Sequence, residues 1–470
     1  MITIIGAGVE KGDLTKRAEE KIRAAELVVL RTGKTPSGES VKELGVPYLT
    51  LDELYEKSRN FSSLTKNIVR EVARLAKGKN LCYVVDGAVS EDAAARILRE
   101  KGDVTVVEGV GKCASAAAAA GLYGAFTGVS AYETEGRELT LPLVVYDLDD
   151  KLLACDIKLQ LMERFGEEVP AYIYHRGEGK KIPLYEADKA EQYDEGTALV
   201  VYDIPLLQKT RFDFADLITV LKRLRAPDGC PWDRVQTHES IRINMIEEAY
   251  ELVDAIDSGV PEKIREEAGD VLMQAAFHTL IEEEKGNFTV TDVLTELLTK
   301  LITRHTHVFG TDSAKDDAGA LSVWEKNKMK EKHQTTYSDA VNDVPACFPA
   351  LLRAQKICKR MEKGGWTFGD EKELRKALAA AQEELFAARA AGDKEGVKAA
   401  LGELLMLAAA TARFAGEDGE QVLLDEVKRA QRKYTAWESL VLADGKQPDS
   451  LTQEEKRFYR EKAENAGKNV

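Results

Sequence analysis

The stretch IEEAYELVDAIDSGVPEKIREEAGDVLMQAAFH, residues 246–278, decides how the second half of this chain folds. Residues three or four positions apart lie on one face of a helix, so Glu248 pairs with Glu251 and Glu267 pairs with Asp270. Both pairs lie among apolar residues, which predicts that two helices pack along the faces that carry the acids. Four carboxylates in one packing seam would repel one another unless a hard cation lay between them. Oxygen ligands suit Mg²⁺ or Mn²⁺, so the stretch predicts a metal site.

The residues between the two acidic pairs predict a tight turn. Ser258-Gly259-Val260-Pro261 separates the two helical patterns, and proline is favoured at the first position of a helix. The chain is therefore expected to fold back here and bring the acidic pairs face to face. A metal ion held in this way keeps positions open for water and phosphate oxygens, and it activates the bound water. Glu247, next to the metal ligands, is expected to orient or deprotonate that water.

Positive and aromatic side chains near this stretch suit a phosphate chain and a nucleobase. Lys300 and Arg304 lie one helical turn apart in KLITRH, where an ammonium and a forked guanidinium can bind phosphate oxygens. The alternative for this pair is to cap a helix or to pair with Glu296. Trp232, in GCPWD, is a candidate for stacking on a base, with a core or interface role as the alternative. His278, on an apolar helix, is expected to be a structural histidine.

The chain changes character near residue 209. Before it, short β-branched runs alternate with helical patterns, which predicts an α/β region. From Asp213 onward, apolar residues recur at helical spacing and strand signals are absent, which predicts an all-α region. The strands are expected at residues 2–5, 27–30, 81–85, 104–107, 141–146, 171–175 and 198–202, and helices at 14–25 and 93–99.

The all-α region contains an internal repeat. An apolar helix, a Gly/Trp/Asp loop, a double-Glu helix, a GD or GE helix and a basic helix occur twice in the same order. The second copy keeps Glu383 and Glu384 but has Ala387 and Ala400 where the first copy has Glu251 and Glu267, and Glu403 replaces Asp270. With two of the four acids missing, the second copy is interpreted as a structural or regulatory module.

The bulk composition excludes several classes of protein. The 470 residues are 44% hydrophobic and 31% charged, as in ordinary globular proteins. The net charge of −15 argues against stable nucleic-acid binding, which needs a basic surface. The six cysteines form no CxxC motif, and neither a signal peptide nor a membrane-spanning run is recognised. A cytoplasmic protein with no membrane partner is therefore expected.

The helical motifs resemble the MazG family of nucleoside triphosphate pyrophosphohydrolases. GCPWDRVQTHESI, IEEAYELVDAI, EEAGDVLMQAAFH, KLITRHTHVFG and VWEKNKMKEK follow one another as in that family, and the resemblance covers about residues 216–333, with a weaker match over 345–440. It implies a dimerising all-α fold that hydrolyses a nucleoside triphosphate to a nucleoside monophosphate and pyrophosphate. It also implies that Glu248, Glu251, Glu267 and Asp270 bind the metal and that Lys300 and Arg304 contact phosphate, as the spacing suggested.

The N-terminal part resembles the SAM-dependent tetrapyrrole methylase family. Gly6-Ala7-Gly8 at the end of the first expected strand, Val85-Asp86-Gly87 and Glu108-Gly109-Val110-Gly111 resemble glycine-rich strand ends of that family. The sequence departs from the family at Val9–Asp13, which replaces its Pro-Gly-Asp, and at Asp86–Val89, which lacks its prolines. The resemblance implies a SAM-binding loop set at Gly6, Gly8, Gly87 and Gly109. The order of the parts is similar to that of YabN-type fusion proteins.

We therefore expect a multi-domain protein, with an N-terminal α/β domain of the tetrapyrrole methylase type followed by all-α MazG-type repeats. The expected domains are 1–208, 213–335, 340–445 and a helical tail at 446–470. The expected function is Mg²⁺-dependent hydrolysis of nucleoside triphosphates by the first repeat in a homodimer. The alternatives are a SAM-dependent methyltransferase whose helical half serves dimerisation or regulation, and a non-catalytic regulator that binds nucleotide or protein through the degenerate repeat.

Overall fold

The computed structural model describes residues 1–102, 104–332 and 336–466. It forms two compact units, Met1–Thr289 and Val290–Val470. The first unit contains the α/β region followed by three α-helices. The described secondary structure of the second unit is entirely helical. The fold class expected from the sequence is confirmed. The four-domain division stays a prediction, and its residues 103, 333–335 and 467–470 lie outside the described part of the chain.

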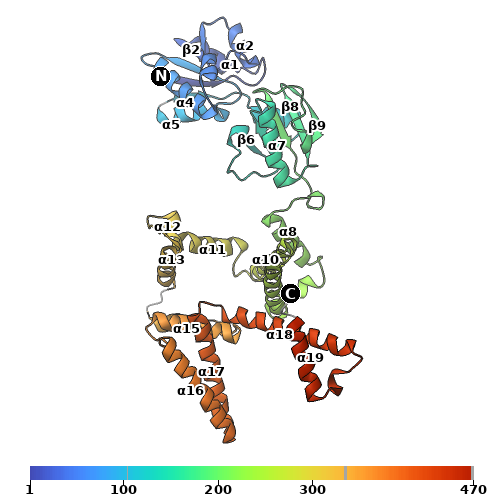
Figure 1. Ribbon diagram of the computed structural model, residues 1–470. Coiled ribbons are helices and arrows are strands. Elements are labelled where there is room, and N and C mark those ends of the chain that lie inside the picture. The colour runs from blue at the N-terminus through green and yellow to red at the C-terminus, as the bar shows by residue number, and fades with distance from the viewer. Residues whose placement is uncertain (103, 333–335, 467–470) are drawn as a thin grey trace. The chain divides into compact units, whose positions relative to one another are not determined.

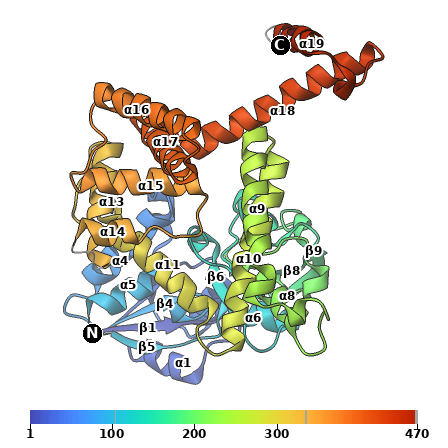
Figure 2. The same cartoon turned by 90° about the horizontal axis from the view of Figure 1, so that it is seen from below.

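The first sheet is parallel and has the strand order β3-β2-β4-β1-β5. β2 is labelled in Figure 1, and β4, β1 and β5 are labelled in Figure 2. Successive side chains of a strand point to opposite faces, so both faces of this sheet need cover. Ile4 packs with α4 and α5, whereas Ile5 packs with α1 and α2. The elements are β1 (Ile2–Gly6), α1 (Lys16–Arg23), β2 (Leu27–Leu30), α2 (Pro36–Glu43), β3 (Tyr48–Thr50), α3 (Asp52–Lys57), α4 (Phe61–Leu75), β4 (Leu81–Val85), α5 (Ala93–Lys101) and β5 (Val104–Val107).

The second sheet is mixed and has the order β6-β7-β10-β8-β9, with one parallel pair, β6–β7. Val145 and Leu199 face α7, and Val144 and Val200 face α6, so this sheet is also covered on both sides. β7 begins after Pro142, which has no N–H to donate, and is therefore two residues shorter than expected. The elements are α6 (Lys112–Ala119), β6 (Thr127–Ser130), β7 (Leu143–Tyr146), α7 (Lys151–Phe165), β8 (Pro170–His175), β9 (Glu178–Pro183) and β10 (Thr197–Val201).

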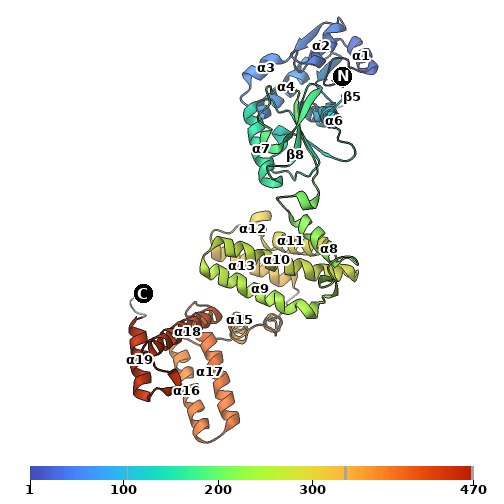
Figure 3. The same ribbon diagram turned by 90° about the vertical axis from the view of Figure 1, so that its right-hand side faces the viewer.

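The helical part of the first unit begins with α8 (Phe214–Arg225), which leads through a loop to the hairpin of α9 (His238–Ser258) and α10 (Pro261–Glu284). Figure 3 shows α9 and α10 running side by side. Arg225, only 9% exposed, holds the loop in place. It donates to both carboxylate oxygens of Glu284 and to the carbonyl oxygens of Asp233 and Gln236.

The second unit contains a further helical hairpin, formed by α16 and α17, against which α15 packs (Figures 1 and 2). Within the described residues no single helix is long and apolar enough to cross a membrane; α17 and α18, bent by 103°, reach that length and hydropathy only as a pair. The helices are α11 (Val290–Arg304), α12 (Thr306–Phe309), α13 (Asp317–Glu331), α14 (Tyr337–Asn342), α15 (Ala350–Lys363), α16 (Glu371–Ala390), α17 (Lys394–Phe414), α18 (Gly419–Ala443) and α19 (Gln453–Ala466).

Candidate functional site

Local sequence signals fix the ends of α9 and α10. The side chain of Thr237 accepts a hydrogen bond from the backbone N–H of Ser240 and caps the start of α9. Gly259 ends this helix with a φ of 65°, a left-handed conformation that glycine adopts without strain. Pro261 then occupies the first turn of α10. Because so short a turn joins them, the helices are antiparallel and their acidic residues face each other.

Three of the four predicted metal ligands come together in this hairpin. One carboxylate oxygen from each of Glu248, Glu267 and Asp270 lies within 4.8 Å of the other two, and all three residues are partly exposed. It is the only group of three or more such ligand residues found within 1–102, 104–332 and 336–466. Glu251, one turn beyond Glu248, is exposed and outside this group, although its charge acts on both Glu248 and Glu267.

The electrostatics of the cluster favour a cation. Partial burial raises the pKa of Glu248, and the neighbouring charges of Asp270 and Glu251 raise it further. The pKa of Glu267 is raised in the same way, by loss of solvent and then by Glu251. The side chain of Gln274, itself buried, opposes the shift by hydrogen bonding to Glu248. A divalent ion would relieve this repulsion, and the donor set is entirely oxygen, as Mg²⁺ and Mn²⁺ prefer.

The other predicted residues of the hydrolytic site lie in three places. Glu247 is exposed on α9 next to Glu248, and Trp232 is 60% exposed in the loop before α9. Lys300 and Arg304 belong to α11 of the second unit. There Lys300 forms an ion pair with Glu296 at 2.6 Å, which is the alternative to phosphate binding that the sequence suggested. The Arg304 guanidinium donates to both oxygens of Glu331 at 2.7 and 2.8 Å and lies 5.5 Å from the Trp324 ring centroid.

The second repeat repeats the hairpin without the cluster. Glu383, Glu384 and Ala387 lie on α16, and Ala400 and Glu403 lie on α17. Ala400 is 4% exposed, so a small apolar side chain fills the position that carries a carboxylate in the first repeat. The hairpin fold is thus kept where the charges of the first copy are lost.

The four glycines predicted to form a cofactor loop meet at the ends of β1, β4 and β5. Gly8 and Gly87 exchange backbone hydrogen bonds of 3.3 and 2.8 Å. A Cβ added to Gly6 would lie 2.6 Å from the Gly109 nitrogen and 2.6 Å from the Gly87 oxygen. A Cβ on Gly109 would lie 2.4 Å from the Gly6 oxygen. Close approach of backbone to backbone within the protein therefore accounts for glycine at Gly6 and Gly109.

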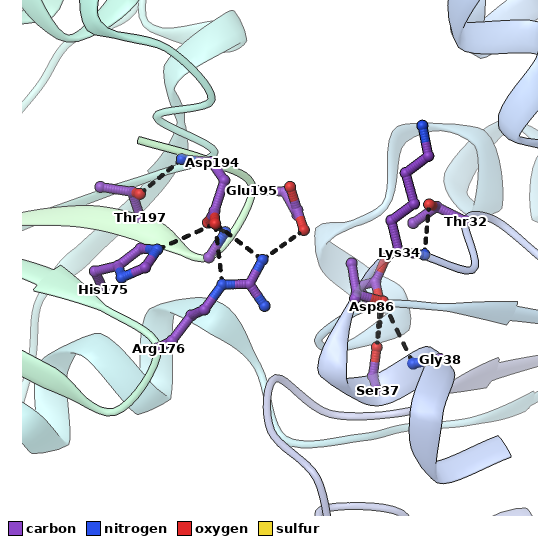
Figure 4. Close-up of polar contacts among 12 residues, drawn as sticks. Thr32, Lys34, Ser37, Gly38, Asp86, His175, Arg176, Asp194, Glu195 and Thr197 are labelled. Atoms are coloured by element: carbon purple, nitrogen blue, oxygen red, sulfur yellow. Dashed lines mark hydrogen bonds and ion pairs between the residues drawn. The ribbon is translucent and has the colours of Figure 1, made fainter. Parts of the chain in front are cut away.

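A cleft of about 390 Å³ lies between the two sheets, and most of the residues that line it were not predicted from sequence motifs. Lys34 and Asp86 come from the side of the first sheet, and Glu195, paired with Arg176 at 2.9 Å, comes from the side of the second (Figure 4). Asp86 accepts hydrogen bonds from the buried hydroxyls of Thr35 and Ser37.

Buried charged groups are among the residues that line this cleft. The Lys112 ammonium lies 2.5 Å from Asp147, whose backbone φ of 62° is uncommon for a residue other than glycine. Burial and the charge of Asp147 raise the pKa of Asp149 to about 6. One oxygen of Asp149 accepts a hydrogen bond from the Tyr132 hydroxyl at 2.9 Å, and the other is buried without a partner among the residues described.

Sequence reasoning also missed a polar chain at the end of the α9–α10 hairpin. His238 Nδ1 lies 2.7 Å from His278 Nδ1, and His238 Nε2 lies 2.6 Å from a carboxylate oxygen of Glu282. The four-residue spacing of Asp270, Gln274, His278 and Glu282 places them on one face of α10, which is a signal that the sequence does contain. The partner His238 could not be found without the register between the helices.

Comparison with known proteins matches both parts of the chain. Residues 236–309 match the MazG nucleotide pyrophosphohydrolase domain, and residues 1–176 match the tetrapyrrole (corrin/porphyrin) methylases. The uncharacterized protein YabN of Bacillus subtilis is 30% identical over 374 residues, which is 76% of each chain.

A relative of the helical part alone is the nucleoside triphosphate pyrophosphohydrolase/pyrophosphatase MazG of Thermotoga maritima. It is 35% identical over 251 residues, 53% of this chain and 95% of that protein. The crystal structure of a precorrin-6Y methylase from Archaeoglobus fulgidus is 17% identical, with a TM-score of 0.33 over 44% of this chain and 99% of the other. The chain belongs to the MazG nucleotide pyrophosphohydrolase family, whose members are hydrolases acting on phosphoric anhydrides, in the YabN-type form with an N-terminal tetrapyrrole methylase-like domain.

Proposed function

We propose that this protein is a Mg²⁺-dependent nucleoside triphosphate pyrophosphohydrolase and that the first MazG repeat carries the activity. The observation that carries the proposal is the convergence of Glu248, Glu267 and Asp270 from two antiparallel helices to within 4.8 Å. The relative from Thermotoga maritima is named as an enzyme of this activity. Substrate and water would give a nucleoside monophosphate and pyrophosphate.

Each residue of the site has a role that follows from its chemistry. Glu248, Glu267 and Asp270 would hold Mg²⁺ or Mn²⁺, and Glu251 would join them by a change of side-chain rotamer. The bound ion supplies charge neutralisation and a more acidic water. Glu247 would accept the proton of the attacking water.

The residues outside the acidic cluster would bind the rest of the nucleotide. Lys300 and Arg304 would exchange their present partners, Glu296 and Glu331, for phosphate oxygens and neutralise charge in the transition state. Trp232, with its exposed indole, would stack on the base.

The apolar face of α9 supports the proposal of a homodimer. Ile243, Ile246, Tyr250 and Val253 alternate three and four residues apart and are 39–53% exposed. This is the spacing of a helix that packs lengthwise against another helix. A second copy of α9 fits this row of apolar residues, because a two-fold axis brings the same surface to both sides of the contact. Sedimentation analysis of the full chain should therefore give a dimer, and a monomer for Ile246→Glu.

The remaining parts are assigned supporting roles. The second repeat, with Ala387 and Ala400, is proposed to be structural or regulatory, within a four-part chain of domains 1–208, 213–335, 340–445 and 446–470. At the predicted SAM loop, close backbone contacts within the protein account for Gly6 and Gly109 without a cofactor. We therefore do not adopt the alternative of a methyltransferase. A cytoplasmic location, with no membrane or nucleic-acid partner, accompanies this proposal.

The test is release of pyrophosphate by the full-length protein from a panel of ribo- and deoxyribonucleoside triphosphates. The proposal predicts release that requires Mg²⁺ and falls about 100-fold or more in Glu267→Gln. Glu403→Gln is the matched control, because it removes an acid from the second repeat, and it should keep the activity. The absence of release from every triphosphate by the folded protein would refute the hydrolase and direct the search to SAM binding by the α/β half.

A further inference from the structure

The chain of His238, His278 and Glu282 joins the first turn of α9 to the last turns of α10. The planes of the two imidazole rings are nearly parallel, with an interplanar angle of 5° and centroids 5.0 Å apart. His238 uses both ring nitrogens, Nδ1 toward His278 at 2.7 Å and Nε2 toward Glu282 at 2.6 Å. Glu282 also accepts hydrogen bonds from Lys285 at 2.7 Å and Asn287 at 2.6 Å. The orientation of both rings is therefore fixed from one end.

The hydrogen bonds determine which nitrogens carry protons. Donors from Lys285, Asn287 and His238 hold the pKa of Glu282 down to about 2, so this residue is an acceptor only. His238 then donates through Nε2, and in a neutral ring, which carries one N–H, its Nδ1 has a lone pair. His278 must donate to that lone pair through its own Nδ1. Burial lowers the pKa of His278, which favours its neutral ring. The remaining nitrogen of His278, Nε2, is left as a hydrogen-bond acceptor.

The acceptor lies on the face of α10 that carries the acidic cluster. Asp270, Gln274 and His278 follow one another at intervals of four residues, and Gln274 hydrogen bonds to Glu248 across the seam. His278 is two helical turns from Asp270, about 12 Å along the axis. His278 is partly exposed, and its Nε2 forms no hydrogen bond with the described residues.

The predicted base-stacking residue is anchored at the same end of α10. Arg225 donates to both oxygens of Glu284 at 2.6 Å and, from the same guanidinium, to the carbonyl oxygen of Asp233 at 2.8 Å. Trp232, next to Asp233 and 60% exposed, is thus held near the end of α10 that carries Glu282. An exposed aromatic ring and a fixed acceptor at one end, and a carboxylate cluster two turns away, match the base or sugar and the phosphates of one nucleotide.

We propose that His278 determines nucleoside specificity by accepting, at Nε2, a hydrogen bond from a donor group of the substrate's base or sugar. His238 and Glu282 are positioning residues that hold the ring of His278 in the acceptor state. The inference rests on the proposed function, since the acidic cluster must be where the phosphates bind. A site built around one fixed acceptor rejects nucleotides that lack the matching donor.

The test compares His278→Ala with the wild-type full chain on sets of triphosphates that differ in one donor. Each set contains a ribonucleotide, its 2′-deoxy form and the analogue without the exocyclic amine. For substrates that have the donor, kcat/KM should fall about tenfold in the variant. For the analogue that lacks it, kcat/KM should barely change, and which analogue this is tells whether sugar or base supplies the donor. Thr279→Val, at the next position of α10, is the matched control and should show no such selectivity.

An equal fall in kcat/KM for all triphosphates, or no fall, would overturn the inference while the hydrolase proposal stood. If the hydrolase proposal itself is wrong, the wild-type protein releases no pyrophosphate, and this result distinguishes the two failures.

A second test needs neither activity nor a variant of His278. The chain has six histidines, so ¹⁵N spectra of histidine-labelled protein are simple enough to assign. The hydrogen-bond chain predicts the Nδ1-protonated tautomer for His278 and the Nε2-protonated tautomer for His238. His238→Ala should remove the tautomer preference of His278. An Nε2-protonated His278 in the wild type would overturn the inference.

Discussion

The substitution Asp270→Asn tests the acidic cluster through the sign of its effect on stability. Asparagine has nearly the shape of aspartate, so the packing of α10 is kept and only the charge is removed. Of the neighbouring charges, that of Asp270 contributes most to the raised pKa of Glu248. Two unit charges at the separation of these carboxylates, up to 4.8 Å, repel by about 1 kcal/mol in a water-like dielectric. Without metal, Asp270→Asn should therefore raise the free energy of unfolding by about 1 kcal/mol.

Metal reverses the order of the two proteins. At a Mg²⁺ concentration 100-fold above its dissociation constant, binding to the folded state stabilises the wild type by about 2.7 kcal/mol. The variant, with a ligand missing and less negative charge, should gain almost nothing. In Mg²⁺ the variant is then the less stable protein by about 2 kcal/mol, whereas in EDTA it is the more stable one.

The assay is urea unfolding of both proteins in EDTA and in Mg²⁺, with Glu403→Gln of the second repeat as the control that shows no reversal. A variant that is less stable than wild type in EDTA would indicate that Asp270 has a structural role. An equal gain from Mg²⁺ in both proteins would place the metal elsewhere. Either result would refute the reasoning.

Three further predictions concern the α/β domain and the α8–α9 loop. The pKa of Asp149, about 6, lies above its value of about 3.9 in an unfolded chain, so ionised Asp149 destabilises the fold above pH 6 and not below pH 4. Asp149→Asn should therefore gain stability relative to wild type as pH rises from 4 to 7, by up to about 3 kcal/mol; a difference that is independent of pH in urea unfolding would contradict this. Gly109→Ala places a Cβ 2.4 Å from the Gly6 oxygen and should lower stability by about 3 kcal/mol, with a lower unfolding temperature. Gly102→Ala should not, because no described residue other than its chain neighbours comes within 4 Å of the added Cβ. Arg225→Met removes the bonds to Glu284 and to the loop and should lower stability by about 2 kcal/mol, and an unchanged urea midpoint would show that the loop is held by other contacts.

Features that depend on local sequence could be predicted. β2, β4 and β5 have the predicted bounds. Each is a short, mostly apolar run such as Leu27–Leu30, which lies between the polar residues Glu26 and Arg31. The turn at Gly259 and Pro261 is where the sequence placed it. Once that turn is fixed, helical periodicity brings Glu248 opposite Glu267 and Asp270, which is why a cluster of acids 22 residues apart could be anticipated.

Features that depend on contacts between distant segments could not be predicted. His238 and His278 are 40 residues apart, and only the register of two helices makes them partners. Lys112 and Asp147 meet across 35 residues, with no spacing rule that would connect them. Glycine is ambiguous for a different reason. Gly6 and Gly109 suggested a loop around a cofactor, and the same residue type is required where two backbones touch.

The most direct test of a metal-dependent site in the first repeat is titration of the full-length protein with Mn²⁺, followed by electron paramagnetic resonance of the free ion. Mn²⁺ accepts the same oxygen ligands as Mg²⁺ and its free form is observed directly. The proposed site predicts that Mn²⁺ binds to the wild type and to Glu384→Gln of the second repeat, is displaced by Mg²⁺, and fails to bind to Glu248→Gln. Equal Mn²⁺ binding by Glu248→Gln and the wild type would contradict the assignment of the metal to the α9–α10 hairpin.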